Sequence, residues 1–239
     1  MPSQRATSFG VGTRVTVKPP SSEAELLRRG RELAGRSLGE VAGRLGAVVP
    51  ENQRRAKGWV GVLVEKALGA TAQSRAEPDF TELGIELKTL PIGASGEPRE
   101  STFVCTIELS RIPEIEWDGS RVKKKLDRVL WFPVQAAPEI PMHDRRLGEP
   151  LLWSPDADET SALRFDWEEL AGRIACFGTH SVTAHLGQYL QVRPKAAHSR
   201  VRTRVMDGEG ELYDTNPRGF YLRTAFTLGL LKKHYARMR

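Results

Sequence analysis

The segment from Asp79 to Lys88 carries two carboxylates and a lysine at spacings that suit metal-assisted phosphodiester hydrolysis. Glu86 and Lys88 are two residues apart in an alternating apolar and polar segment, so on a β-strand both side chains leave the same face. With Asp79 in the turn before that strand, two carboxylates could surround one Mg2+, whose hard charge prefers oxygen ligands. The ion would lower the pKa of a bound water, and Lys88 would orient that water or offset charge on the phosphate.

This pattern is short and loosely spaced, so chance also produces it. The alternative interpretation is a solvent-facing strand surface on which Glu86 and Lys88 form an incidental ion pair. Other catalytic motifs do not occur in the sequence, which has no HExxH, GxSxG, Walker A or GxGxxG segment. His180 and His185 are five residues apart, a spacing that does not bring both onto one helical face for zinc.

Helices and strands are mixed among the elements that would position these residues, which predicts an α/β architecture. Capping boxes at 22–25 and 37–40 begin two helices, and a third is expected over 58–68 with Gly69 as its C-cap. Its inward residues would be Trp59, Val62, Leu63 and Ala67. Strands are expected over 84–90 (ended by Pro91), 102–109, 128–134, 189–193 and 219–223, and further helices over 161–177 and 224–237. Four tryptophans are expected mainly in the core: Trp117, Trp131, Trp153 and Trp167.

Composition is that of a globular protein, with 39% hydrophobic and 28% charged residues in 239. No segment has the ~18 apolar residues that a membrane span needs, and the first residues lack the apolar core of a secretory signal. Two cysteines alone favour a reducing cytoplasm over a disulfide framework. Residues 191–239 hold eleven Lys/Arg and four Asp/Glu, against a net charge of +6 for the whole chain. This concentration of charge favours a polyanion partner, and the alternative is a solvated basic surface.

Seven blocks, in order from about residue 50 to 222, resemble the MutH family. They are PENQRRAKGWVGVLVE (50–65), DFTELGIELKTLP (79–91), TFVC (102–105), VKKKLDRVLW (122–131), PLLWSP (150–155), GQYLQVRPKAA (187–197) and PRGFYL (217–222). The resemblance implies a restriction endonuclease-like mixed sheet flanked by helices, with DNA in a cleft between two lobes. Residues 1–20 would form an extended lead, about 21–110 the catalytic lobe and about 111–239 the DNA-recognition lobe.

The same resemblance implies roles for single residues. Asp79 and Glu86 would be ligands of Mg2+, for which Mn2+ would substitute, and Lys88 would be the catalytic lysine. Further active-site residues would be Glu65, Lys57 and Lys125. The alternative for Glu65 is a surface carboxylate at a helix end. The alternative for Lys125 is a solvated basic face, and within the run 123–125 the match could be off by one residue.

Arg193, Pro194, Lys195 and Tyr221 match the base-reading residues of the family. The planar fork of arginine suits guanine O6 and N7, while a rigid proline and an aromatic ring suit a pocket around the adenine N6 group. The alternative for Tyr221 is a half-buried strand aromatic. The chain departs from the family mainly in a basic loop at 200–204 and in the tail lysines 232 and 233.

The implied activity is a Mg2+-dependent endonuclease of methyl-directed mismatch repair. It would nick the unmethylated strand of double-stranded DNA at hemimethylated GATC sites, when recruited by ATP-bound MutL after MutS has found a mismatch. Two alternatives stay open. One is an autonomous GATC restriction endonuclease. The other is a non-catalytic DNA-binding module, which the presence of Asp79, Glu86, Lys88 and Glu65 disfavours.

Overall fold

The computed structural model describes residues 16–51, 58–72, 77–195, 201–206, 210 and 212–236. Its α-helices are α1 (Glu23–Leu33), α2 (Leu38–Arg44), α4 (Trp59–Leu68), α5 (Arg121–Leu126), α6 (Ala157–Phe177) and α7 (Thr224–Ala236). Single 3-10 turns are η1 (Thr81–Leu83), η2 (Ile112–Glu114), η3 (Trp117–Gly119), η4 (Met142–Asp144) and η5 (Thr179–Ser181). In this part of the chain no helix is long and apolar enough to cross a bilayer.

The strands form three small sheets. Their bounds are β1 (Glu86–Ile92), β2 (Thr102–Thr106), β3 (Val129–Gln135), β4 (Leu151–Trp153), β5 (Leu190–Pro194), β6 (Thr203–Met206), β7 (Leu212–Thr215) and β8 (Arg218–Leu222). The first sheet is mixed, with β3 parallel to β1 and antiparallel to β4. The second is antiparallel, in the order β2-β8-β5, and β6 and β7 form a hairpin. The predicted mixture of helices with a mixed sheet is therefore present.

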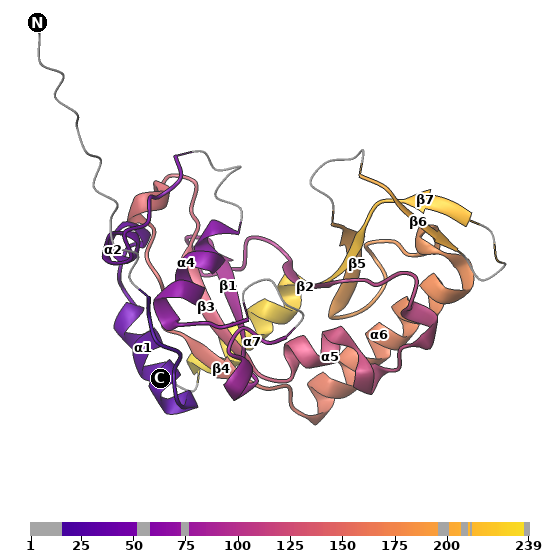
Figure 1. Cartoon of the computed structure of the whole chain (residues 1–239), viewed down its shortest axis with the longest axis horizontal. Coiled ribbons are helices and arrows are strands. Elements are labelled where there is room, and N and C mark those ends of the chain that lie inside the picture. Colours follow the sequence, from indigo (N-terminus) through magenta and orange to yellow (C-terminus); the bar gives the residue numbers. More distant parts are fainter. Residues whose placement is uncertain are drawn as a thin grey trace, which may run out of the picture.

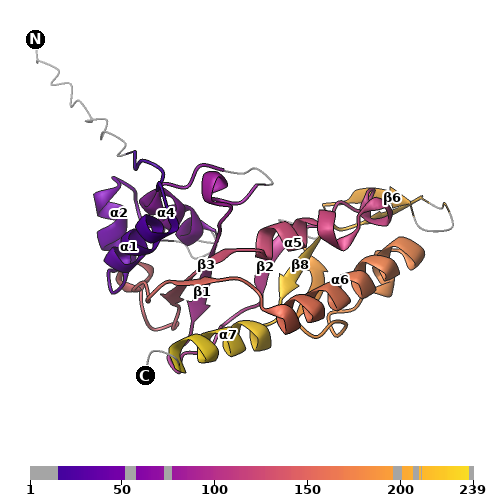
Figure 2. The ribbon, with the colours of Figure 1, turned by 90° about the horizontal axis from the view of Figure 1, so that it is seen from below.

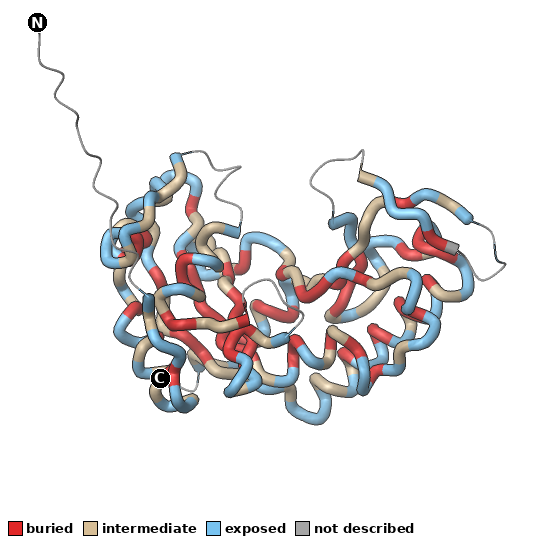
Figure 3. Tube along the Cα trace, in the orientation of Figure 1, coloured by how far each residue is buried: buried red, intermediate tan, exposed pale blue. Residues whose placement is uncertain are grey.

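Figure 1 shows these elements in two groups, with α1, α2, α4 and the β1-β3-β4 sheet in one and β5 to β7 with α6 in the other. Helix α7 runs beneath the first sheet toward α6, as the view from below shows (Figure 2). Buried residues occur in both groups (Figure 3). The two larger sheets do not divide along the chain near residue 110, because β3 and β4 join β1 while β2 joins β8.

Strand β1 lies between two hydrophobic clusters. Ile85 and Leu87 belong to the cluster of α1, α2 and α4, whereas Leu90 belongs to the cluster built around α6 and the second sheet. The predicted alternation of side chains between the two faces of β1 is therefore correct, but a hydrophobic cluster covers each face. Glu86 is 4% exposed and Lys88 9% exposed, so the interpretation of a solvent-facing polar strand is wrong.

The helices begin and end where the sequence supplies caps. Ser22 Oγ accepts the Glu25 N–H at α1, and Ser37 with Glu40 completes a capping box at α2. Helix α4 lies between Gly58 and Gly69, whose φ angles of 84° and 83° are left-handed. The cap at Gly69 places the C-terminal end of α4 against the extended segment that precedes α1.

Several expectations differ from the structure, and one is the strand expected over 102–109, which ends at Thr106. Pro91 does not end β1, which continues to Ile92, because β1 is an edge strand that tolerates a residue without an N–H. Val62 on α4 is 44% exposed, while Val64 is buried in its place. Within the expected basic loop at 200–204, residues 203 and 204 belong to β6, and Arg204 pairs with Asp214 across the hairpin.

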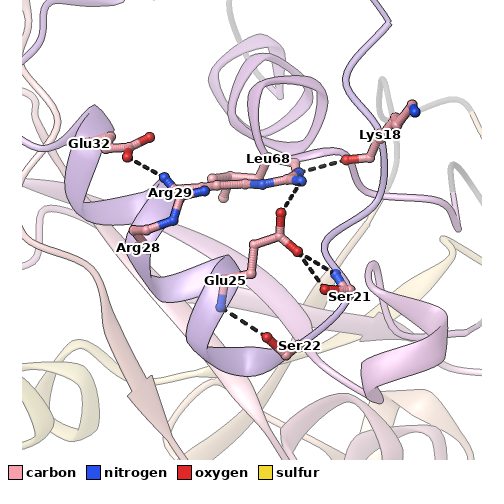
Figure 4. A network of polar contacts seen from close by, with 8 residues as sticks. All are labelled: Lys18, Ser21, Ser22, Glu25, Arg28, Arg29, Glu32 and Leu68. Atoms are coloured by element: carbon pink, nitrogen blue, oxygen red, sulfur yellow. Dashed lines mark hydrogen bonds and ion pairs between the residues drawn. The ribbon is translucent and has the colours of Figure 1, made fainter.

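A polar network holds the first helix to the end of α4 (Figure 4). Glu25 accepts from the Ser21 N–H at 2.8 Å and from the Ser21 hydroxyl at 2.7 Å, and it pairs with Arg29 at 2.6 Å. Arg29 also donates to the backbone carbonyls of Lys18 and Leu68. The network therefore ties the lead segment, α1 and α4 together at one point.

We expect Glu25→Gln to lower the melting temperature at neutral pH, because the bonds from Ser21 and Arg29 favour the charged carboxylate. These bonds lower the pKa of Glu25 from 4.5 to about 2. A carboxyl whose pKa is lower in the folded than in the unfolded chain stabilises the fold at any pH above its unfolded-state pKa. This stabilisation is lost as the pH falls toward the folded-state pKa. The difference between variant and wild type should therefore shrink from pH 4.5 toward 2 in thermal melts.

The matched control is Glu32→Gln, in the exposed Arg28–Glu32 pair of the same helix. Exposed pairs of this kind contribute little to stability, so this variant should melt close to wild type throughout. A Glu25→Gln difference that stays constant down to pH 2 would contradict the proposed role of the network.

Candidate active site

Asp79 reaches strand β1 through a tight turn. The turn η1 ends at Gly84, whose φ of 65° is left-handed, and the Phe80–Ile85 bridge closes it. This brings the Asp79 carboxylate back over β1, where its Oδ2 accepts the Leu87 N–H at 2.8 Å. Asp79 is 8% exposed. The turn therefore holds a buried carboxylate beside the strand that carries Glu86.

The carboxylate of Glu86 is held by two lysines. Its Oε1 lies 2.6 Å from Lys88 Nζ on the same strand face, and its Oε2 lies 2.7 Å from Lys125 Nζ. All three side chains are buried. Because charges attract strongly where water is excluded, this triad is a rigid, charged group in the interior.

Helix α5 supplies Lys125, and geometry distinguishes it from its neighbours in the lysine run. Ser120 caps the helix by accepting the Lys123 N–H. Lys125 Nζ bonds both Glu86 and the backbone carbonyl of Glu77, at 2.7 and 2.6 Å. Lys123 instead pairs with Asp127, and Lys124 is exposed. The register that was open in the sequence therefore places Lys125 in the site.

Glu65 approaches the same site from α4. Its side chain is half-buried, and burial, followed by the charge on Glu86, raises its pKa above the usual range. Lys88 and Lys125 act on it in the opposite direction. Glu65 is therefore close enough to the triad to share its field, rather than an isolated surface carboxylate. Lys57 lies outside the described residues.

Carboxylates crowd one another in this site. Burial and the charge on Glu86 raise the pKa of Asp79 to about 7, with a smaller contribution from Glu65. A divalent cation would relieve this repulsion, and hard cations such as Mg2+ prefer carboxylate oxygen. Among the described residues, no three His, Cys, Asp or Glu side chains form a metal-binding group. The buried carboxylates of Asp79 and Glu86 offer the oxygen donors that a hard divalent cation prefers.

A second group of side chains gathers on the β2-β8-β5 sheet. Arg193 Nη1 donates to Ser101 Oγ at 2.8 Å, and Lys195 Nζ lies 4.0 Å from the centre of the Phe103 ring. Tyr221 meets the same ring edge to face, with centroids 5.3 Å apart. Arg193, Pro194 and Lys195 are exposed, and Tyr221 is partly buried. One face of the sheet therefore carries Phe103, Tyr221, Arg193 and Lys195, whereas Pro194 alternates to the opposite face.

Sequence reasoning missed Phe103 and Ser101. Both lie at or next to β2, which pairs with β8 through Phe103 and Tyr221 although 118 positions separate them. Neither residue carries a local signal, because an aromatic in a strand usually packs in the core. Only the pairing of β2 with β8 brings Phe103 into contact with Tyr221 and Lys195.

Strand β2 connects the two groups of side chains. Phe103 lies among the exposed basic residues, whereas Cys105, two residues later, is buried near the triad. Burial raises the pKa of the Cys105 thiol to about 11, and the charges that act on it include Lys88, Lys125 and Glu86. Helix α5 packs on the same strand. The basic surface and the buried triad therefore share one structural support.

Comparison with known proteins decides the family. Residues 68–166 match the family model of the DNA mismatch repair enzyme MutH. The chain is 48% identical to the DNA mismatch repair protein MutH of Citrobacter koseri over 224 residues, which cover 94% of this chain and 97% of that protein. It is 47% identical to MutH of Escherichia coli (strain K12) over 93% of this chain and 97% of that protein. The chain belongs to the MutH family.

MutH proteins are DNA mismatch repair endonucleases, and this chain is one of them. The mixed sheet with its flanking helices is the restriction endonuclease-like fold of the MutH family. A nuclease of this family uses a divalent metal, which agrees with the crowded carboxylates around Glu86. The family assignment rests on most of the chain rather than on one motif.

We expect Lys125→Met to reduce DNA cleavage by about 10²-fold or more, the usual cost of removing a preorganised cationic or hydrogen-bonding group from a transition state. Methionine keeps most of the apolar lysine stem in this buried position, while the ammonium beside Glu86 is lost. The measurement is single-turnover nicking of a DNA duplex.

Lys124→Met is the matched control, because Lys124 is the adjacent residue on α5 and is exposed. It should cut within a few-fold of the wild-type rate, as expected for a surface substitution. Equal rates for the two variants would show that the ammonium of Lys125 takes no part in catalysis.

Proposed function

We propose that this chain nicks the unmethylated strand of hemimethylated GATC sites in methyl-directed mismatch repair, with Mg2+ as its metal. The observation that carries the proposal is the joint support of two groups by β2. One is the buried group of Asp79, Glu86, Lys88 and Lys125, and the other is the basic surface around Phe103. Chemistry on a phosphodiester needs the first group, and sequence selection needs the second.

In the proposed mechanism Asp79 and Glu86 would hold Mg2+, and Glu65 adds negative charge beside them. Once bound, the ion would supply Lewis acidity toward the phosphate and lower the pKa of a water molecule. Lys88 and Lys125 place two ammonium groups next to Glu86. There they orient the attacking water and offset charge that develops on the phosphate. Lys57 is proposed as a further lysine near the scissile phosphate.

Base recognition is assigned to the second sheet. Arg193 presents a planar fork suited to guanine O6 and N7, and its bond to Ser101 fixes one side of that fork. Tyr221, held edge to face by Phe103, would lie against the adenine N6 group. A methyl group on N6 would collide with the ring, so methylation would act by steric exclusion. Pro194 and Lys195 complete the contact surface.

The DNA duplex is proposed to lie between a catalytic lobe, built around the β1-β3-β4 sheet, and a recognition lobe, built around the β2-β8-β5 sheet. ATP-bound MutL would recruit and activate the enzyme after MutS has found a mismatch, in the cytoplasm. The rival function is an autonomous GATC restriction endonuclease of the same superfamily. Wild-type protein should therefore nick GATC DNA slowly alone and much faster with MutL and ATP, whereas a restriction enzyme would be fast without them.

Cleavage should require Mg2+ or Mn2+ and stop with EDTA. Asp79→Asn and Glu86→Gln should abolish nicking while DNA binding is largely kept, because each change removes a metal ligand but no phosphate contact. Nicking of a supercoiled GATC plasmid and a gel-shift titration measure the two properties. Glu82→Gln, an exposed carboxylate on η1 close to Asp79 in the chain, should behave as wild type. Cleavage at the wild-type rate by Asp79→Asn or by Glu86→Gln would refute the proposed metal site.

The methyl group should be sensed at Tyr221. Wild-type protein, with MutL and ATP, should nick the unmethylated strand of hemimethylated GATC and leave fully methylated sites intact. Tyr221→Ala opens space for the methyl group, so the ratio of rates on unmethylated and methylated strands should narrow. Single-turnover nicking of strand-labelled duplexes with a methyl on neither, one or both strands measures this ratio.

Tyr213→Phe is a control for general effects of changing a tyrosine in this part of the fold, because Tyr213 lies in the β6-β7 hairpin and bonds Thr179. Its strand ratio should match that of wild type. Equal cleavage of all three duplexes by wild-type protein would end the methyl-sensing proposal. A Tyr221→Ala ratio equal to wild type would instead move the sensor to Pro194 or Lys195.

A further inference from the structure

Asp166 on α6 is a buried carboxylate that lies apart from the active-site group. It is 1% exposed, and its two oxygens accept three consecutive backbone N–H groups. These are Gln188 at 2.7 Å, Tyr189 at 2.5 Å and Leu190 at 2.8 Å. A buried carboxylate satisfied by backbone amides fixes the chain that supplies them.

Arg223 holds the preceding carbonyls of the same segment. Its guanidinium donates to the backbone carbonyls of Ala184 at 2.7 Å, Leu186 at 2.8 Å and Gly187 at 3.0 Å. The backbone N–H of Arg223 donates to the Tyr189 carbonyl at 2.8 Å. Two charged side chains therefore fix the segment 184–190: Arg223 binds its backbone carbonyls, and Asp166 binds its backbone amides.

Gly187 lets the segment fit between the two charges. Its φ of 81° is left-handed, and a Cβ at this position would lie 2.2 Å from the Leu190 carbonyl oxygen. A side chain there would force the backbone apart. The segment is thus held by three residues that sequence reasoning did not single out as functional, although Gly187 begins one family-like block and Arg223 directly follows another.

The segment 184–190 leads directly into β5, and Arg223 directly follows β8. Along the paired strands, Leu190 is opposite Leu222, Gln191 opposite Tyr221 and Arg193 opposite Gly219. Both strands are therefore fixed at the same end, within three residues of Tyr221 and Arg193. A slip of one residue would turn each side chain to the other face of the sheet.

We propose that Asp166 and Arg223 are positioning residues for base recognition, acting through the segment 184–190 to set Arg193 on β5 and Tyr221 on β8 relative to each other. This inference rests on the proposed function of Arg193 and Tyr221 as base readers. Both residues act through their bonds to backbone groups of this segment. Their effect falls on the choice of sequence, because a base-edge contact tolerates less displacement than an attraction to the phosphates.

The test is Arg223→Lys. Lysine keeps the positive charge, so general attraction to phosphates is preserved, but it cannot reproduce the guanidinium fork that reaches three carbonyls. The measurement is the ratio of nicking rates on a GATC duplex and on a duplex with one base pair of GATC changed, with MutL and ATP present. The ratio should fall about tenfold, within what one bidentate base contact supplies, while affinity for DNA without GATC stays at the wild-type value.

Two further proteins separate positioning from general stability. Arg164→Lys, in an exposed pair on α6, is the matched control and should leave the ratio unchanged. The double variant Arg193→Ala/Arg223→Lys should lose less discrimination than the product of the two single losses, because both changes act in part through Arg193. Asp166→Asn, assayed well below its own melting temperature, should lower the ratio as Arg223→Lys does.

An unchanged ratio in both Arg223→Lys and Asp166→Asn would overturn the inference, as would losses that multiply in the double variant. Failure of the proposed function has a different signature. In that case wild-type protein would show no preference for GATC, or Arg193→Ala would keep the full preference.

Discussion

Both oxygens of the Glu86 carboxylate are held by ammonium groups, one from its own strand and one from helix α5. Removing one partner from a buried ion pair typically costs about 3–5 kcal/mol, because the remaining charge stays away from water. Glu86, Lys88 and Lys125 therefore constrain where β1 and α5 can lie. Since α5 packs on β2, the same constraint extends to the sheet that carries Phe103 and Tyr221.

A row of aromatic rings makes a second connection between the sheets. Trp131, opposite Lys88 in the register of β1 and β3, meets Trp153 at 6.2 Å between centroids. Trp153 meets Phe226 of α7 at 5.7 Å, and Phe226 meets Tyr189 at 4.9 Å. Tyr189 lies in the segment that Asp166 and Arg223 hold. Close-packed interiors transmit displacements. Strands β1 and β5 are therefore connected through one continuous row of packed aromatic rings.

Local chemistry made much of this fold predictable. The serine caps of α1 and α2, the glycine after α4 and the alternation around Glu86 all act within a few residues, and the helices and main strands occur near their expected positions. Burial of Trp117, Trp131 and Trp167 also follows from their apolar surface. The approach of Lys125 to Glu86, 39 residues away, and of Phe103 to Tyr221 has no local signal. The short strand β4 has none either, because three residues are too few to show a period.

Strand β2 has consequences for how the protein is made. Thr102 pairs with Leu222, so β2 leaves the ribosome 120 residues before its partner β8. Until then its hydrogen-bonding edge has no native neighbour, and pairing over such a separation is slow because a long loop must close. The sheet that would select the DNA sequence is thus completed only after residue 222 has been synthesised. A nascent chain that already contains every carboxylate of the proposed metal site would still lack the surface proposed to choose where to cut.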